Sequence, residues 1–422
     1  MRKLLRLIVV SVGAVALIGV VLALVAPRLI DPGTYKQRLS ALIKERTGHT
    51  LRIDGDVKLA VFPWLTLELG PVQLSNAPGF GPLPLLQAQH SLVRIKLLPL
   101  LRQQVQIERL SLNGVQLRLA RDAGGTSNWL GPSGTATSNA AAPDPTLALQ
   151  GIGGIELLNA SLVWEDRRAG SFYQVSDLNV HTGRFAPGLP FAISIGCKIA
   201  TGQNAPVYQL QFSSTLNAEP ATQRYRLRNT HLELGLPQGG VATLSSDVDL
   251  DLAQQSLILP AIEISVHGLK LSGKLTGVHI RDNPDLRGEL QVAQFSPREL
   301  LKALGKALPE GADAAALATA SARFGWRAGR DQITLQPLTL TLDDSTASGE
   351  LSIRDFAAPR FGVVLEVDAI NMDRYLPPPD VVTKAAPWPV TTLQTLNLGG
   401  SLHIGRLQAY QVHSTDVRLT FN

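Results

Sequence analysis

The sequence has few of the residues that would support a disulfide, a thiolate metal site or a nucleic-acid interface. Its 422 residues include one cysteine, Cys197, so neither an internal disulfide nor a metal site built on thiolates can form. Charged residues make up 17% of the chain, against roughly 25% in ordinary soluble domains. The net charge of +5 is spread thinly, with no Lys/Arg-rich run after residue 6. A nucleic-acid-binding protein would need a clustered basic surface, so that class is excluded.

A nucleotide-binding loop is also missing. Gly268 to Lys274 has the glycine spacing of a phosphate-binding loop, but Leu275 follows where a hydroxyl is needed for Mg²⁺. The stretch alternates like a strand and opens no helix, so no helix N-terminus would face a phosphate. We therefore expect no bound nucleotide.

Metal and catalytic motifs fail in the same way. Asp247, Asp249 and Asp251 begin like a calcium loop, but Leu252 stands where that loop needs a glycine. A solvated strand face explains the three aspartates better. The eight histidines include no pair at helical metal-ligand spacing, and no G-x-S-x-G nucleophile motif occurs. We expect no enzyme activity, no catalytic or metal-binding residues and no cofactor.

One long apolar run is present, at the N-terminus. Leu7 to Ala26 is twenty residues without a charge, which matches the hydrocarbon thickness of a bilayer. Arg2, Lys3 and Arg6 precede it, so the positive-inside rule places residues 1–6 in the cytoplasm and the body on the other side. The run is too long for a signal peptide and ends without a small-x-small cleavage site. We predict a single uncleaved transmembrane helix over 7–26.

A short amphipathic helix is predicted next, with Asp31 as N-cap, Pro32 in its first turn and Gly48 after its end. Beyond it the period changes to two, which predicts antiparallel strands with one apolar and one polar face. Clear examples are Leu65–Leu69, Leu232–Leu236, Val248–Leu252, Ile262–Val266 and Val417–Phe421. In the N-terminal part the apolar face would consist of Leu65, Leu67, Leu69, Val72, Leu74, Val115, Leu117 and Leu119.

Two segments interrupt the strand pattern. Residues 131–149 are rich in small residues and proline, and we interpret them as a linker. Ser296 to Glu299 is a capping box that predicts a helix, and Asp313 would start a second, alanine-rich helix to about Ala322. The expected organisation is an N-terminal β region over 27–130, the linker, a β-rich region over 150–295, a helical insert over 296–325 and a C-terminal β region over 326–422.

Several stretches along the chain resemble the AsmA family of bacterial envelope proteins. They are Thr47 to Gly55, Phe62 to Leu65, Leu74 to Gly79, Asp122 to Gly125 with Asn128-Trp129, Leu158 to Asp166, Phe295 to Gly305, Leu342 to Thr346 and Met372 to Pro378. The resemblance implies an inner-membrane anchor, a periplasmic body and a role in outer-membrane biogenesis. It also implies kinship with bridge-like lipid-transfer proteins of the chorein type, whose strands curl into an elongated groove.

Two functions fit this resemblance. In the first, the groove binds or conducts phospholipid acyl chains between the inner and outer membranes, and the eight apolar residues named above line it. In the second, the protein carries no lipid and serves as an assembly factor or regulator for outer-membrane proteins or lipopolysaccharide. Longer family members continue with a further glycine-rich β segment, so the resemblance also predicts a shortened C-terminus with Val417–Phe421 as an edge strand.

Overall fold

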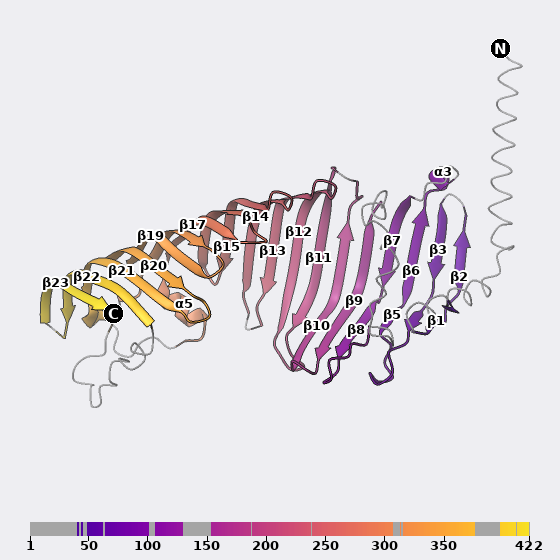
Figure 1. The fold of residues 1–422 in the computed structure, drawn as a ribbon, viewed down its shortest axis with the longest axis horizontal. Helices are drawn as coiled ribbons and strands as arrows, with labels where there is room; N and C mark the ends of the chain where they lie inside the picture. Colours follow the sequence, from indigo (N-terminus) through magenta and orange to yellow (C-terminus); the bar gives the residue numbers. More distant parts are fainter. Residues whose placement is uncertain are drawn as a thin grey trace, which may run out of the picture. The chain divides into compact units, whose positions relative to one another are not determined.

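The computed structural model describes residues 40–41, 44, 49–61, 64–100, 106–129, 153–186, 188–237, 239–306, 313, 315–375, 397–410 and 412–421. These residues form 23 strands and a few short helices, which confirms the prediction of a mainly β protein (Figure 1). They divide into two compact units, Met1–Ala221 with Leu234–Pro237, and Thr222–Glu233 with Gln238–Asn422. Each unit is described separately below.

The first unit contains an open sheet built on the long strand β9. One row of short strands, β2–β3–β6–β7, pairs with the first half of β9, and a second row, β1–β4–β5–β8, pairs with its second half. The strands β10, β11 and β12 continue the sheet on the other side. The bounds are β1 (Leu51–Ile53), β2 (Val57–Ala60), β3 (Leu65–Leu69), β4 (Val72–Leu74), β5 (Leu86–Ala88), β6 (His90–Ile95), α3 (Leu97–Leu100), β7 (Ile107–Asn113), β8 (Gln116–Arg121), β9 (Ile155–Asp166), β10 (Ser171–Thr182), β11 (Pro190–Ala200) and β12 (Val207–Glu219).

The two rows of short strands are halves of longer strands, broken along one line. The breaks fall at Gly55, Gly70, Gln89 and Gly114, and the line reaches β9 at Asn159, whose φ is +52°. Gly55 and Gly70 lie so close that a Cβ on either would collide with the other's backbone. An irregularity of this kind reverses the odd–even alternation of side chains. The apolar residues are odd-numbered in β3 and even-numbered in β4, so they stay on one face across the break.

The second unit is a meander of long strands. Neighbouring strands from β14 to β21 pair antiparallel in chain order, and β22 pairs antiparallel with β23. The bounds are β13 (Arg224–Gly235, its last two residues in the first unit), β14 (Val241–Asp251), β15 (Ser256–Val266), β16 (Leu269–Val278), β17 (Asp285–Phe295), α5 (Pro297–Ala303), β18 (Ala320–Ala328), β19 (Gln332–Leu342), β20 (Ser345–Arg354), β21 (Arg360–Asn371), η1 (Met372–Arg374), β22 (Asn397–Ala409) and β23 (Val412–Phe421).

Three strand pairings differ from the antiparallel sheet that alternation predicted. The strands β7 and β8 run parallel to β9, and β21 runs parallel to β22. Parallel neighbours need a crossover connection of a dozen or more residues. The β8–β9 and β21–β22 connections are both long enough. The first crossover includes residues 131–149, which lie outside the described residues. Because strands on the two sides of this segment pair directly in one unit, it connects parts of a single sheet and does not separate two domains.

The helical insert is shorter than predicted. Its first helix is present as α5, where the side chain of Ser296 accepts a hydrogen bond from the Glu299 N–H as the capping box requires. The predicted alanine-rich helix is wrong for the described part of its range, because residues 315–317 form a turn and β18 begins at Ala320. Pairing with β19 and contacts to Asp343 outweigh the helix propensity of alanine here.

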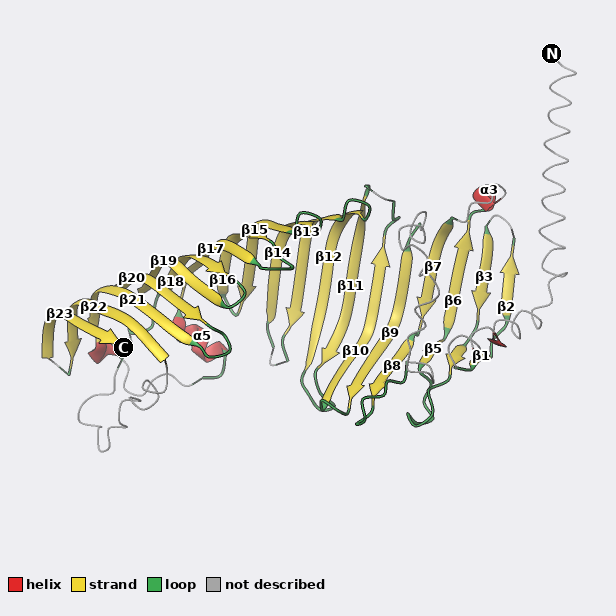
Figure 2. Ribbon diagram, in the orientation of Figure 1, coloured by secondary structure: helices red, strands yellow, loops and turns green. Residues whose placement is uncertain are grey.

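A closed core is nearly absent from the described residues. The buried apolar side chains there are Leu85, Ala88, Ala160, Ala218, Ala316, Leu338 and Ile404, and most other apolar residues are half-buried. Figure 2 shows the strands of the first unit side by side in one layer. The apolar side chains therefore form a face of a sheet, with little interior.

The predicted membrane span over 7–26 and most of the short helix after it lie outside the described residues. Among the residues that are described, no helix has the length and apolar character needed to cross a bilayer.

The neighbouring glycines Gly399 and Gly400 allow a matched test of this backbone. Gly400 has φ +134°, and a Cβ there would collide with the Val363 carbonyl oxygen, whereas a Cβ on Gly399 would meet open space. We expect Gly400→Ala to destabilise the fold by about 1–3 kcal/mol through backbone strain, and Gly399→Ala to change little. Thermal unfolding followed by fluorescence measures both variants. Equal melting temperatures would contradict the strained geometry at Gly400.

Candidate functional site: an apolar sheet face and a polar clamp

The eight predicted lining residues lie in β3, in β4, in β8 and just before β8. All eight are half-buried. Leu67 lies directly between Leu59 and Val93, and Leu117 lies between Leu86 and Leu162. Residues directly opposite each other on paired strands share a face. The structure therefore places the predicted residues in apolar rows that run across the strands of the first unit.

The second unit has an apolar row of its own, which the sequence did not reveal. Ten apolar residues lie directly opposite one another on the ten successive strands β14 to β23. All are half-buried except Ile404, which is buried. The row consists of Leu244, Ile264, Leu271, Val292, Ala322, Leu340, Ala347, Val367, Ile404 and Val417. Such a face offers a continuous apolar surface at right angles to the strands.

The opposite face of the second unit carries cross-strand ion pairs. Asp251 accepts a hydrogen bond from Arg224 at 2.9 Å, and Asp249 one from Arg228 at 2.6 Å. These aspartates, predicted to lie on a solvated strand face, are partly exposed there and paired with arginines of the neighbouring strand. On β17, hydrogen bonds from Arg287 and Arg327 lower the pKa of Asp285 to about 2. The polar face is thus tied together by charge across the strands.

A polar clamp holds the connecting segments at the β19–β20 turn of the second unit. The Asp343 carboxylate accepts hydrogen bonds from the N–H groups of Leu317, Ala318 and Thr319 at 2.8–3.0 Å, and from the Tyr375 hydroxyl at 2.8 Å. Burial opposes the charged form of this carboxylate, but the four donors outweigh it, so the pKa of Asp343 lies below its ordinary value. Burial and the bond to Asp343 also raise the pKa of Tyr375 to about 12.

Two arginines complete the clamp. Arg298 of α5 donates to the carbonyl oxygens of Asp313 and Ala316 at 2.7 and 2.6 Å. Arg374 donates to Asp344 at 2.8 Å and to the Ala315 carbonyl at 3.1 Å. Guanidinium groups have donors in a fixed fork, which suits them to binding several carbonyl oxygens of a bent segment. The segment that sequence predicted as a helix is therefore held as a turn by side chains from three separate elements.

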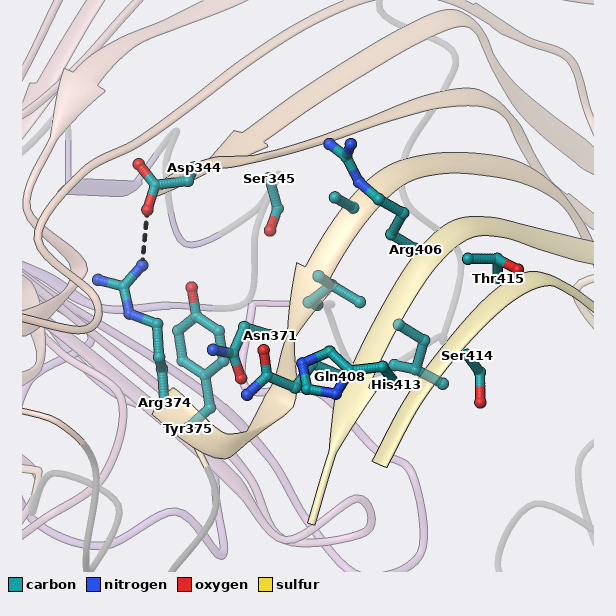
Figure 3. A pocket seen from close by; sticks show the side chains of 13 residues that line it. Asp344, Ser345, Asn371, Arg374, Tyr375, Arg406, Gln408, His413, Ser414 and Thr415 are labelled. Atoms are coloured by element: carbon teal, nitrogen blue, oxygen red, sulfur yellow. Dashed lines mark hydrogen bonds and ion pairs between the residues drawn. The ribbon is translucent and has the colours of Figure 1, made fainter. Parts of the chain in front are cut away.

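A pocket of about 390 Å³ lies beside the clamp, at the ends of β21, β22 and β23 (Figure 3). Arg374 and Asp344 stand on one side of it, and Ser414 and Thr415 on the other. Its remaining polar lining is Ser345, Asn371, Tyr375, Arg406, Gln408 and His413. Within the described residues no lining hydroxyl is hydrogen-bonded to the histidine, as an activated nucleophile would be. The arrangement offers hydrogen bonds and charge to a small polar group.

Comparison with known proteins identifies the family. The sequence matches the AsmA family over residues 1–391, which is most of the chain. The chain belongs to the AsmA family. A curated relative, Protein AsmA of Escherichia coli (strain K12), is 29% identical over 91 residues, which is 22% of this chain and 14% of the relative's length. No solved structure matches the chain.

Three of the stretches that resemble the family come together in the second unit. Phe295 to Gly305, Leu342 to Thr346 and Met372 to Pro378 supply Arg298, Asp343 and Tyr375 to the clamp. The sequence does not indicate that these three stretches meet. The sequence feature that could have indicated the clamp is a set of polar residues next to strand ends. Which of these residues are partners follows only from the fold.

The first unit contains a second clamp of the same kind. Asn128 is fully buried, and its amide donates to Asn76 at 3.0 Å and to the Arg118 carbonyl at 2.8 Å. Beside it the rings of Trp129 and Trp164 lie 5.2 Å apart. All but Arg118 belong to stretches that carry the family resemblance. In both units these residues stabilise connections at strand ends.

Replacing Asp343 tests the first clamp. Asp343→Asn removes the charge that four donors share, which we expect to cost about 1.5–3 kcal/mol of stability at neutral pH. The folded-state pKa of Asp343 lies below the ordinary value of 3.8. The stabilisation by its charge is therefore complete at pH values above 3.8 and is lost as the pH falls through the folded-state pKa. Melting temperatures of both proteins across acidic pH should therefore converge. The neighbouring Asp344→Asn is the control. Its side chain is 92% exposed and accepts a hydrogen bond from Arg374, so weakening this surface ion pair should cost less than about 1 kcal/mol.

Proposed function

We propose that this AsmA-family protein acts in the cell envelope, in outer-membrane biogenesis, by holding phospholipid acyl chains on the apolar face of its sheet. The observation that carries the proposal is the ten-strand apolar row of the second unit, whose side chains are only half-buried. Family membership supports the envelope role. The chain spans 14% of the length of the curated relative it matches. The proposed binding of acyl chains therefore rests on the structure of this chain and not on that relative.

The energetics favour an amphipathic ligand. Exposing one methylene to water costs about 0.8 kcal/mol, so moving a sixteen-carbon chain through water costs on the order of 12 kcal/mol. Rows of Leu, Val and Ile running across successive strands would lower that cost at each step. Conduction along such a face requires no reaction chemistry, so the proposal includes no enzyme activity and no cofactor.

Glycines in the apolar rows support a sheet that bends toward this face. A Cβ on Gly273 would collide with the Glu289 carbonyl oxygen, and one on Gly349 with that of Val364. Glycine within a strand marks close backbone approach or a sharp bend, and designed sheets use it to introduce curvature. Such bending would turn the apolar face into the predicted groove, which partly shields acyl chains from water.

The predicted anchor sets the proposed location. A span over residues 7–26 with the basic flank on the cytoplasmic side would hold both units on the periplasmic side of the inner membrane. The lipids of that membrane would then be within reach of the apolar face.

Photo-crosslinking at two adjacent positions of β21 tests the proposal directly. Val363 lies on the apolar face, opposite Leu351, whereas Val364 lies opposite Glu350 and is 52% exposed. With a benzophenone side chain at each position in turn, we expect acyl-chain adducts at 363 and none at 364 when membranes containing the full chain are irradiated. Mass spectrometry identifies the adducts. Absence of lipid at both positions would favour the assembly-factor role, in which no lipid is carried.

Introducing a carboxylate on the apolar face tests whether that face is an open groove or a closed, packed interior. Leu67→Asp should reduce the lipid that co-purifies with the protein while the fold is kept, because the side chain is only half-buried. Leu338→Asp is the reference, since Leu338 is 2% exposed and burying an unpaired carboxylate costs about 3–5 kcal/mol. Circular dichroism and lipid analysis are measured on the same samples. Unfolding of Leu67→Asp to the same extent would show that the face is closed in the first unit.

A further inference from the structure

Two strand connections lie next to each other at one end of the first unit. The β2–β3 connection ends at Trp64, and the β6–β7 connection begins at Lys96 and contains α3. Leu65 pairs with Ile95, and Ile95 with Ile107, so both connections leave the sheet at the same end (Figure 2). We call this end the tip.

The tip presents large apolar side chains to solvent. Leu98 of α3 is 78% exposed, and Trp64 is 38% exposed. Single exposed apolar residues are common on soluble proteins, but here two of them stand on adjacent connections. Transfer of an exposed leucine out of water is favourable, so the tip would be stabilised by an apolar environment.

Cations lie near the ends of the strands that carry these connections. Arg94 and Arg109 lie directly opposite each other on β6 and β7, and Lys96 follows β6. Within the described part of the chain, none of these three cations forms an ion pair. Glu108 is the one acidic residue in the sequence from Arg94 to Arg109. Like charges opposite each other on paired strands are destabilising, so an external anion would relieve this arrangement.

We propose that the tip inserts into the headgroup region of an anionic phospholipid bilayer. Two residues of strand span about 7 Å, so Arg94 and Lys96 are separated by roughly the depth of one headgroup layer. Leu98 then reaches the acyl boundary, and Trp64 lies at the interface that tryptophan prefers. Each cation near an anionic surface adds to the attraction. The apolar contact is a few side chains, which is small for a protein partner but sufficient for shallow insertion.

This proposal is independent of lipid transport and of the predicted anchor. It assigns a membrane contact to the sheet itself, which would align the ends of β2, β3, β6 and β7 with the bilayer surface. A test must therefore separate the tip from any anchoring by residues 7–26.

A fluorescent label at two positions of the full chain provides that separation. In a Cys197→Ser background, an environment-sensitive dye is attached to Leu98→Cys at the tip. The control is Leu83→Cys, since Leu83 is 57% exposed and lies in the β4–β5 connection at the opposite end of the same sheet. An anchor would bring both labels to the membrane, so a difference between them reports the tip.

In vesicles of phosphatidylcholine with phosphatidylglycerol, we expect a blue shift and quenching by brominated lipid for the dye at 98, and a water-like spectrum at 83. Arg94→Gln with Lys96→Gln should reduce the shift at 98, as should high salt. Water-like spectra at both positions, or equal shifts at both, would overturn the assignment. An equal shift in vesicles of phosphatidylcholine alone would overturn the role of the cations. Circular dichroism checks that each labelled protein keeps its β structure.

Discussion

The structure depends on keeping apolar side chains on one face of sheets that have little interior. Because side chains alternate along a strand, a slip of one residue would turn a whole apolar set to the wrong face. The chain meets this constraint with irregular residues whose backbone groups are capped from the next strand. Asn159, with φ +52°, donates its N–H to the Asn179 side chain at 3.0 Å, and Asn229, also at φ +52°, donates to Asp247 at 2.9 Å. Each cap binds an N–H that the bulge would leave unpaired.

This constraint also determines how the units are stabilised. With few buried apolar residues, hydrophobic stabilisation comes from side chains that stay half in contact with water. Cross-strand ion pairs on the polar face and clamps at the strand ends add to it. An acyl chain on the apolar face would remove more apolar area from water than the protein removes alone, so ligand binding and stability are expected to be linked.

Much of this fold could be predicted from alternation, but only between irregularities. In β15 the predicted stretch Ile262–Val266 is the second half of a strand that starts at Ser256. Its first half has apolar residues at odd positions, Leu257 and Leu259, and the register shifts between Leu259 and Ile262. A pattern search with a fixed period ends at such a bulge. The parallel pairings of β9 and of β22 are equally invisible to alternation, because a half-buried strand has the same pattern whichever way its neighbour runs.

In the candidate site, too, alternation predicts some residues and not others. The eight predicted lining residues lie in apolar rows because alternation alone determines which face a residue takes. The clamps could not be predicted, since Asp343 bonds to partners 24 to 32 residues away in the chain. The alanine-rich segment before β18 takes the conformation that those contacts require and not the helix that its alanines favour.

This difference matches the position of the family resemblance, because six of its eight stretches supply a residue to one of the two clamps. An apolar row needs only side chains of suitable size and hydrophobicity, and Leu, Ile, Val and Ala all occur in the ten-strand row of the second unit. A clamp needs a particular donor and acceptor geometry, such as the Asn128 amide between Asn76 and the Arg118 carbonyl. An apolar face can therefore exchange one apolar residue for another and stay apolar, whereas a clamp depends on particular donors and acceptors.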